Sequence, residues 1–256
     1  MSLVLLFPPS LGRLKATARA QLLADTLTRW LGQAVHVEVA ETYAELETRV
    51  LQCDVDLAWA PPSVCARAEK DAPAIFKSVR QGRDHYRAAL VGRARSLPAI
   101  DNLRGLRAAW VDPLSTGGHL LAVSLLAARG LDIKTLFSEQ RFYGSYQGAL
   151  LAVLGGDADV GAVYSHGDDE AAARETLVSH VGASEVELAP FAYTDPSPND
   201  GLIVTSRPSN VRPLIADLAH VTDGSRGPTL LLEIFEADTL IRAEPGDYSA
   251  VGRALS

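Results

Sequence analysis

Cysteine is almost absent from this sequence, which contains only Cys53 and Cys65. Two thiols are too few for a disulfide framework, and their spacing is not the C-x-x-C of metal or redox sites. Both residues lie among apolar neighbours, so we expect two buried free thiols. No other motif in the chain indicates a bound metal or cofactor, and we predict neither.

Long apolar runs are also missing. No stretch reaches the roughly 18 apolar residues that a membrane-spanning helix needs, so we expect no membrane insertion. Residues 1–7 are apolar, but they lack a basic region and are too short for the core of a signal peptide. We therefore expect a buried strand there. The protein is periplasmic if an export signal has been removed, and cytoplasmic otherwise.

Positive charge is the third scarce feature. The chain has 24 Lys and Arg residues against 31 Asp and Glu residues, a formal net charge of −7. An extended nucleic-acid surface needs clustered basic side chains, so we expect no nucleic-acid partner. The densest basic stretch, residues 80–95, is interpreted as a solvated loop leading into a strand. A small anionic ligand stays compatible, because local backbone amides decide anion binding.

Strand and helix patterns alternate along the whole chain. Short apolar or alternating runs predict strands at residues 3–7, 35–39, 56–60, 75–79, 86–91, 106–111, 141–143, 159–164 and 202–205. Helical spacing and capping residues predict helices at residues 13–31, 43–52, 64–70, 120–128, 146–154, 211–221 and 228–235. Repeated units of this kind predict an α/β protein with mostly parallel sheets covered by helices.

Two segments interrupt this alternation. Residues 96–105 are polar and rich in turn-forming types, and residues 190–198 contain three prolines. We interpret both as crossings between lobes. The sequence thus predicts one lobe from residues 1–93 and 198–256, and a second lobe from residues 94–197 inserted into it. A ligand cleft is expected between the lobes.

The sharpest local motif is residues 112–118, Asp-Pro-Leu-Ser-Thr-Gly-Gly, between a predicted strand and a predicted helix. Amides at a helix N-terminus bind anions readily, with the positive end of the helix dipole. Ser115 and Thr116 add hydroxyl donors, and Gly117 permits close approach of the backbone to a ligand. A plain N-cap without a ligand explains the motif equally well. No Lys follows the glycines, so a Walker A nucleotide loop is excluded.

Aromatic residues follow two predicted strands, at the edge where ligands bind in open α/β sheets. Trp59 is interpreted as a core residue, whereas Tyr43, in the first turn of a helix, is the better ligand candidate. His119 follows the glycines and is equally consistent with contact to an anion and with a place on the helix surface. Residues 165–170 resemble a metal cluster, but their acids are better interpreted as helix caps.

An ordered set of segments resembles the phosphate/phosphite/phosphonate-binding family of type 2 periplasmic binding proteins. The resemblance covers roughly residues 1 to 235, and the whole set is far more specific than any one piece. The segments are residues 43–46, 54–59, 86–91, 103–118, 142–150, 155–163 and 198–202. The fold that this resemblance implies is the two-lobed one expected above, with the second lobe inserted in the first.

The resemblance also implies a set of ligand contacts. Tyr43 and Tyr86 would line the cleft, and Ser115 and Thr116 would bind the oxygens of a phosphonate. Asp200 would meet an amino group or hydroxyl of the ligand.

Two positions depart from the family pattern. Gly117 stands where the family usually has a third hydroxyl, and Tyr146 stands where it usually has a His. A phenol still donates one hydrogen bond, so Tyr146 is compatible with binding an oxyanion. We include both residues among the predicted ligand contacts.

Three functions are compatible with the sequence. The first is a solute-binding protein of an ABC importer, which takes a small anionic ligand to a permease. The second is a ligand-sensing domain of a signalling protein, cytoplasmic or part of a longer chain. The third is an enzyme of the same fold, resembling chorismate dehydratase. It ranks last because no acid/base pair is framed by a motif, and we predict no catalytic residue.

Overall fold

The computed structural model of the chain describes residues 2–9, 13–167, 169–182, 187–222 and 229–255. It divides into two compact units, unit 1 from residues 1–85 with 198–256 and unit 2 from residues 86–197. The first boundary comes earlier than predicted, because strand β5 (His85–Arg93) pairs with strands of unit 2. Unit 2 is thus inserted in the sequence of unit 1.

Unit 1 contains a six-stranded sheet with the order β12-β4-β11-β3-β1-β2. Its strands are β1 (Leu3–Phe7), β2 (Val35–Val39), β3 (Leu57–Ala60), β4 (Ala74–Val79), β11 (Gly201–Val204) and β12 (Thr239–Arg242). β1 pairs in parallel with β2 and β3, whereas β11 and β12 run antiparallel to their neighbours. The start of β11 therefore lies at the edge where β1, β2 and β3 end.

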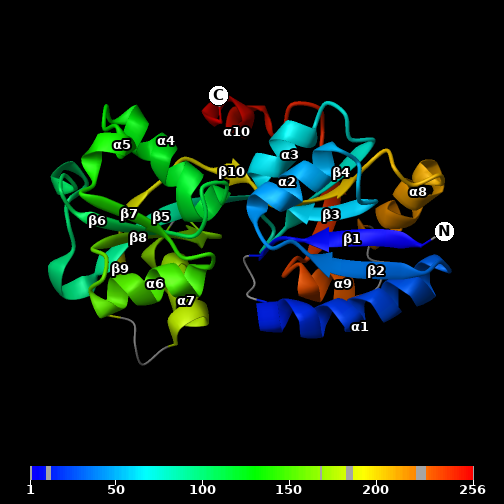
Figure 1. The fold of residues 1–256 in the computed structure, drawn as a ribbon, viewed down its shortest axis with the longest axis horizontal. Helices are drawn as coiled ribbons and strands as arrows, with labels where there is room; N and C mark the ends of the chain where they lie inside the picture. The colour runs from blue at the N-terminus through cyan, green and yellow to red at the C-terminus, as the bar shows by residue number, and fades with distance from the viewer. Residues whose placement is uncertain (1, 10–12, 168, 183–186, 223–228, 256) are drawn as a thin grey trace. The chain divides into compact units, whose positions relative to one another are not determined.

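Helices cover both faces of this sheet (Figure 1). α1 (Arg13–Leu31) and α9 (Thr229–Ile234) lie on one face, and α2 (Tyr43–Leu51) and α3 (Pro62–Ala68) on the other. α8 (Val211–Thr222) and α10 (Ser249–Ala254) complete the unit. α2 begins as predicted, since the Thr42 hydroxyl accepts a hydrogen bond from the Glu45 amide and the Glu45 carboxylate accepts one from the Glu41 amide.

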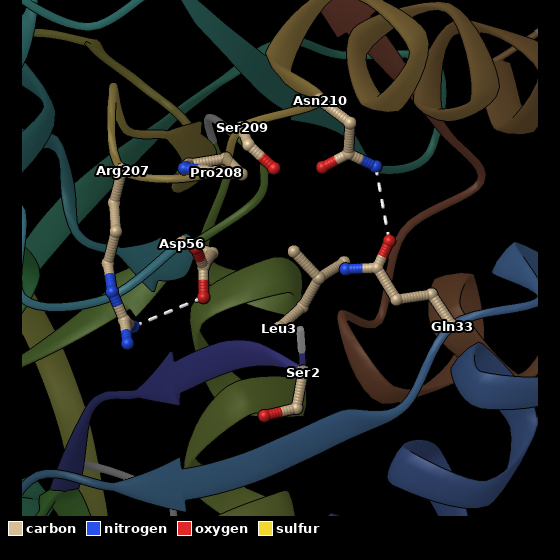
Figure 2. A pocket seen from close by; sticks show the side chains of 8 residues that line it. All are labelled: Ser2, Leu3, Gln33, Asp56, Arg207, Pro208, Ser209 and Asn210. Atoms are coloured by element: carbon tan, nitrogen blue, oxygen red, sulfur yellow. Dashed lines mark hydrogen bonds and ion pairs between the residues drawn. The ribbon is translucent and has the colours of Figure 1, made fainter.

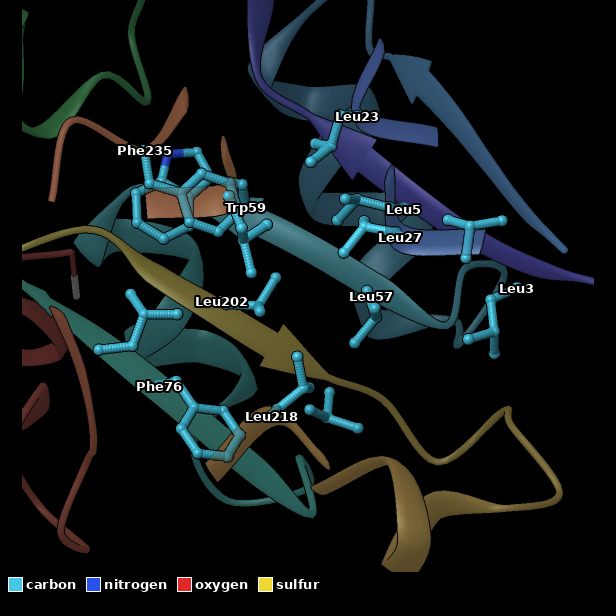
Figure 3. Packing of buried hydrophobic residues seen from close by; sticks show 14 of the residues in the cluster. Leu3, Leu5, Leu23, Leu27, Leu57, Trp59, Phe76, Leu202, Leu218 and Phe235 are labelled. Atoms are coloured by element: carbon cyan, nitrogen blue, oxygen red, sulfur yellow. The ribbon is translucent and has the colours of Figure 1, made fainter. Parts of the chain in front are cut away.

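The core of unit 1 is built from leucines and aromatic rings (Figure 3). Trp59 and Phe235 stack face to face with ring centroids 3.7 Å apart, and Trp59 is buried. The interpretation of Trp59 as a core residue is therefore confirmed. Leucines from β1 and α1 pack beside this pair, which fixes α1 on the sheet.

Unit 2 contains a second six-stranded sheet, in which β10-β5-β8-β6-β7 form the path and β9 pairs with β5. Its other strands are β6 (Arg107–Trp110), β7 (Glu139–Phe142), β8 (Val160–Ser165), β9 (Leu188–Tyr193) and β10 (Ser197–Pro198). Among the described strand pairs of unit 2, only those of β6 with β7 and β8 are parallel, so the prediction of a mostly parallel sheet is wrong for this unit. Strands buried on both faces are apolar whichever way they run, so their sequences did not reveal the direction.

Two hydrophobic clusters hold unit 2 together, one on each face of its sheet. α6 (Tyr146–Gly155) and α7 (Glu170–Val181) cover one face. α4 (Leu121–Ala128) and α5 (Ile133–Leu136) cover the other, as Figure 1 shows. The π-helical turn η4 (Thr116–Leu120) leads into α4, and the 3₁₀ turns η2 (Ala94–Ser96) and η3 (Ile100–Asn102) follow β5.

Several elements were not predicted. β9 occupies part of the segment 190–198 that we expected to be a crossing, and β12, α5, α7 and α10 were missed. Asp169 caps α7 through the Ala172 amide, which confirms the capping interpretation for that acid. Asp168 lies outside the described residues.

The two thiols differ from each other. Cys65 is buried as predicted, but Cys53 is only partly buried and has a positive φ of 52°. Cys53 lies in the tight turn between α2 and β3, which keeps it near the surface. Among the helices of the described residues, none is long and apolar enough to cross a bilayer.

Candidate ligand-binding site

The predicted anion motif follows β6 and forms the start of η4. Ser115 and Thr116 are 2% and 1% exposed. The Gly118 amide donates a hydrogen bond to the Ser115 hydroxyl oxygen at 3.3 Å, so Ser115 is an N-cap. This bond uses a lone pair of the oxygen and leaves the hydroxyl proton as a donor. Capping and ligand binding are therefore compatible at Ser115.

The two glycines of the motif are packed against different neighbours. A Cβ on Gly118 would lie 2.4 Å from Cγ2 of Val111, so Gly118 lets η4 pack against the end of β6. A Cβ on Gly117 would lie 2.8 Å from the Tyr146 hydroxyl and 3.1 Å from Cε2 of Tyr86. The structure thus brings Tyr86 and Tyr146 together at Gly117.

A cluster of aromatic rings surrounds Tyr146. His180 stacks on its ring at 5.2 Å, and Tyr164 meets it edge-on at 5.2 Å. His166 lies 5.1 Å from the Tyr164 ring and 6.4 Å from the Tyr86 ring. These rings fix the direction in which the Tyr146 hydroxyl points.

Tyr164 and His180 were not predicted from the sequence, and His166 was predicted only as a member of a segment that resembles a metal cluster. Among the described residues, no group of His, Cys, Asp and Glu is arranged to hold a metal ion. Tyr164 and His166 lie at the carboxyl end of β8, beside β6. That place in a parallel pair is where ligand contacts are expected, so it was a usable signal.

His119 packs against aromatic rings at the ends of β6 and β7. Its ring packs 5.5 Å from Trp110 and 5.1 Å from Phe142, and its Nδ1 is 2.9 Å from the Pro113 carbonyl oxygen. A carbonyl only accepts, so Nδ1 carries the proton. Burial lowers the pKa of His119, an effect that the Pro113 hydrogen bond opposes. We therefore interpret the contacts of His119 as structural.

Tyr43 and Asp200, the other predicted ligand contacts, belong to unit 1. Tyr43 begins α2 after β2, and Asp200 comes directly before β11, so both lie at the edge where the parallel strands end. The Tyr43 side chain is 3% exposed. Asp200 keeps 30% of its side-chain surface exposed.

Asp200 is paired with an arginine. Its carboxylate accepts a hydrogen bond from Nη2 of Arg80 at 3.2 Å. Nη2 also donates to the carbonyl oxygen of Phe235, and Nε of the same arginine donates to those of Phe235 and Glu236. The guanidinium sits 5.9 Å over the Trp59 ring. Burial raises the pKa of Asp200, and the charge of Arg80 opposes that rise. The interpretation of this basic stretch as solvated is wrong for Arg80, because these contacts leave its side chain 11% exposed.

A second cluster of charged side chains includes residues just before residue 86, where unit 2 begins in the sequence. Nζ of Lys77 lies 2.7 Å from the Asp84 carboxylate and 2.9 Å from that of Asp247. These carboxylates raise the pKa of Lys77 although burial alone would lower it. The Asn199 side chain donates to the Ser78 and Arg83 carbonyls. These contacts, all within unit 1, are structural.

A pocket of about 310 Å³ lies at the opposite edge of the unit 1 sheet, near the starts of β1 and β3 (Figure 2). Arg207 and Asp56 form an ion pair across it at 3.1 Å, and Asn210 donates to Gln33 at 3.1 Å. None of the predicted ligand contacts lines it. Because Arg207 pairs with Asp56 and Asn210 with Gln33, we interpret this pocket as structural.

The sequence matches one protein family over residues 5–248, which is nearly the whole chain. That family is described as the periplasmic substrate-binding protein of phosphonate ABC transporters. The chain belongs to this family. The predicted recognition is therefore confirmed, and with it the function of an ABC-importer-type solute-binding protein. A search of curated proteins found no match.

Solved structures of such proteins share the fold. PhnD1 from Prochlorococcus marinus (MIT 9301), in complex with methylphosphonate, is 19% identical with a TM-score of 0.78, over 99% of this chain and 96% of that one. The binding-protein component of an ABC phosphonate transporter from Pseudomonas aeruginosa is 16% identical with a TM-score of 0.81, over 99% and 85%. The predicted two-lobed α/β fold of type 2 periplasmic binding proteins is confirmed.

A protein that binds a different kind of ligand also shares the fold. The alkanesulfonate-binding protein SsuA from Xanthomonas axonopodis pv. citri, bound to MOPS, is 12% identical with a TM-score of 0.58. The match covers 99% of this chain and 90% of that one. At such identities the likeness shows the fold, so the ligand has to be argued from the site.

Proposed function

We propose that the chain binds a small oxyanion at the start of η4, with Ser115, Thr116, Tyr86 and Tyr146 as contacts from unit 2. The observation that carries this proposal is the convergence of the two tyrosines on Gly117, directly after the two hydroxyl residues. The turn is π-helical, a rare geometry that is frequent at functional sites. A phosphonate, a phosphate-like anion or a sulfonate all carry the oxygens that such a site recognises.

The chemistry of the site favours an anion without requiring a cation. Hydroxyl protons are donors, and amides at a helix start carry partial positive charge. Hydrogen bonds to a charged acceptor are worth about 1.5–3 kcal/mol each, so three or four of them account for micromolar binding. The three atoms nearest to the Cβ position of Gly117 all belong to tyrosines.

Tyr43 and Asp200 stay proposed contacts from unit 1. Asp200 would accept a hydrogen bond from an amino group or hydroxyl of the ligand. Its carboxylate is shared with Arg80, so any ligand contact there would involve the ion pair as a whole. A change at Arg80 should then alter this contact as well.

The biological role proposed follows from the family. A periplasmic substrate-binding protein delivers its solute to an ABC permease, and we propose the same location and partner here. We also propose that the chain has no enzymatic activity, since its family is one of binding proteins. The sensor and enzyme alternatives are not favoured by the comparisons.

The test is a thermal-shift screen of the purified chain against methylphosphonate, inorganic phosphate, sulfate and an alkanesulfonate. A ligand that binds only the folded state raises the Tm by mass action, because at a free concentration L it stabilises that state by RT ln(1 + L/Kd). Choline and glucose, a cation and a neutral solute, are the controls. A rise in Tm with choline or glucose alone, and with none of the anions, would overturn the proposal.

A further inference from the structure

Glycine at position 117 is not explained by backbone conformation. The glycines with positive φ are found at other positions, which are Gly32, Gly82, Gly105, Gly130, Gly144, Gly156, Gly182 and Gly246. The backbone of Gly117 is therefore one that other residues adopt. What excludes a side chain there is space alone.

That space is filled by the end of a tyrosine side chain. A Cβ on Gly117 would meet the Tyr146 hydroxyl at 2.8 Å, a distance that real Cβ contacts essentially never show. The Tyr146 ring is held by the stacked His180 ring and the edge of Tyr164, so its hydroxyl cannot simply turn aside. The remaining neighbours, Cε2 of Tyr86 at 3.1 Å and Cβ of Tyr164 at 3.3 Å, are tight but need to shift only slightly.

We infer that Gly117 and Tyr146 form one coupled unit, in which the Tyr146 hydroxyl takes the place of a side chain at residue 117. The oxygen that a serine at position 117 would present from η4 is presented instead by a phenol from α6. The first part, that the two residues pack against each other, depends only on this geometry. The second part, that the phenol donates to the bound oxyanion, rests on the proposed function.

Substitutions at positions 117 and 146 should therefore depend on each other. Serine at position 117 and tyrosine at position 146 compete for one space, so Gly117→Ser should be harmful in the wild-type protein. Tyr146→Phe removes the oxygen that lies closest to the new Cβ. Serine at position 117 should then fit, and its hydroxyl should replace the lost donor.

The experiment is a double-mutant cycle over Gly117→Ser and Tyr146→Phe, measured by Tm without ligand and by titration with methylphosphonate and with inorganic phosphate. Gly117→Ser alone should lower the Tm by about 2–10 °C through overpacking. Tyr146→Phe alone should weaken oxyanion binding about tenfold, the value of one hydrogen bond of about 1.4 kcal/mol. The double variant should recover most of both losses, within about threefold of wild-type affinity.

Gly118→Ala is the matched control. Its new Cβ would meet Val111 rather than a tyrosine, so Tyr146→Phe should not rescue it. Equal effects of Gly117→Ser in both backgrounds would overturn the coupling. If the Tm values are coupled but Tyr146→Phe binds the anions as tightly as the wild type does, the donor role of Tyr146 is overturned. The packing of the pair then still stands. If neither anion binds the wild-type protein, the proposed function fails, and with it the donor role, while the Tm cycle still decides the packing.

Discussion

The two units place charge differently at the edges where their parallel strands end. In unit 1 that edge carries Arg80 and Asp200, paired at 3.2 Å. In unit 2 the corresponding edge carries the hydroxyls at the start of η4 and the tyrosines around Gly117. Its strong ion pair, Arg107 with Asp159 at 2.8 Å, lies at the start of β6 and β8, at the other edge of that sheet.

This difference separates stability from binding. Charges that pair with one another and with carbonyls support the fold, so a ligand contact at Asp200 would involve its ion pair with Arg80 as a whole. Uncharged hydroxyls at a helix start can cap the helix through an oxygen lone pair and still donate a proton to an anion. We therefore expect substitutions at Arg80 to act on unfolding and substitutions at Thr116 to act on affinity.

The largest effect is expected from Arg80→Met. This change leaves the Asp200 carboxylate and the Phe235 and Glu236 carbonyls without their donor. Removing one partner of a partly buried pair costs about 2–4 kcal/mol of the free energy of unfolding. Urea denaturation followed by circular dichroism measures it. A loss below about 0.5 kcal/mol, the level of an exposed ion pair, would show that this cluster is not structural.

The second expected effect is on the pH dependence of stability. It should have opposite signs for Asp159 in unit 2 and Asp200 in unit 1. The Arg107 guanidinium holds the pKa of Asp159 below its usual value, although burial opposes this. A lowered folded-state pKa gives stability that is present above the unfolded value of about 3.9 and is lost as the pH falls through the folded value. Asp159→Asn should lower the urea midpoint at pH 7, and this loss should shrink as the pH falls below about 3.9.

Asp200 provides the comparison for that measurement. Its pKa is raised by burial, so its contribution is present below the unfolded value and is lost as the pH rises through the folded value. Asp200→Asn should therefore cost less at pH 7 than Asp159→Asn does. Urea midpoints of both variants at pH 3, 5 and 7 decide this. Equal losses at pH 7 would contradict the difference between the two pairs.

The smallest effect is expected from Arg174→Ala. Arg174 pairs with Glu170 one turn earlier on the exposed side of α7. Such pairs stabilise a helix by about 0.2–0.5 kcal/mol. This variant calibrates the urea measurements in unit 2 and should leave oxyanion affinity unchanged. A shift above about 1 kcal/mol would mean that the exposed pairs of this protein are stronger than their setting indicates.

Much of the fold was predictable because strands and helices alternate with clear caps. Thr42 and Ser145 cap α2 and α6 as their sequences predict. The direction of β5, β9, β11 and β12 was not predictable, since a buried strand looks alike in either direction. The first unit boundary was missed for the same reason: nothing in the sequence of β5 says which sheet it joins.

The site was predictable in part. Ser115 and Thr116 lie between β6 and α4, and the resemblance supplied Tyr86 and Tyr146. The pairing of Asp200 with Arg80 joins residues far apart in the sequence, so no local sequence pattern predicts it. The relation between Gly117 and Tyr146 likewise depends on where α6 places a ring.

The most direct test of the central claim is calorimetry of oxyanion binding by the wild type and by Thr116→Val. The valine keeps the shape of the side chain and removes only the hydroxyl. Thr135→Val, an exposed threonine on α5 of the same unit, is the matched control. Against the best anion of the screen, Thr116→Val should bind about tenfold or more weakly, and Thr135→Val like the wild type. Unchanged affinity in Thr116→Val would mean that the start of η4 is only a helix cap.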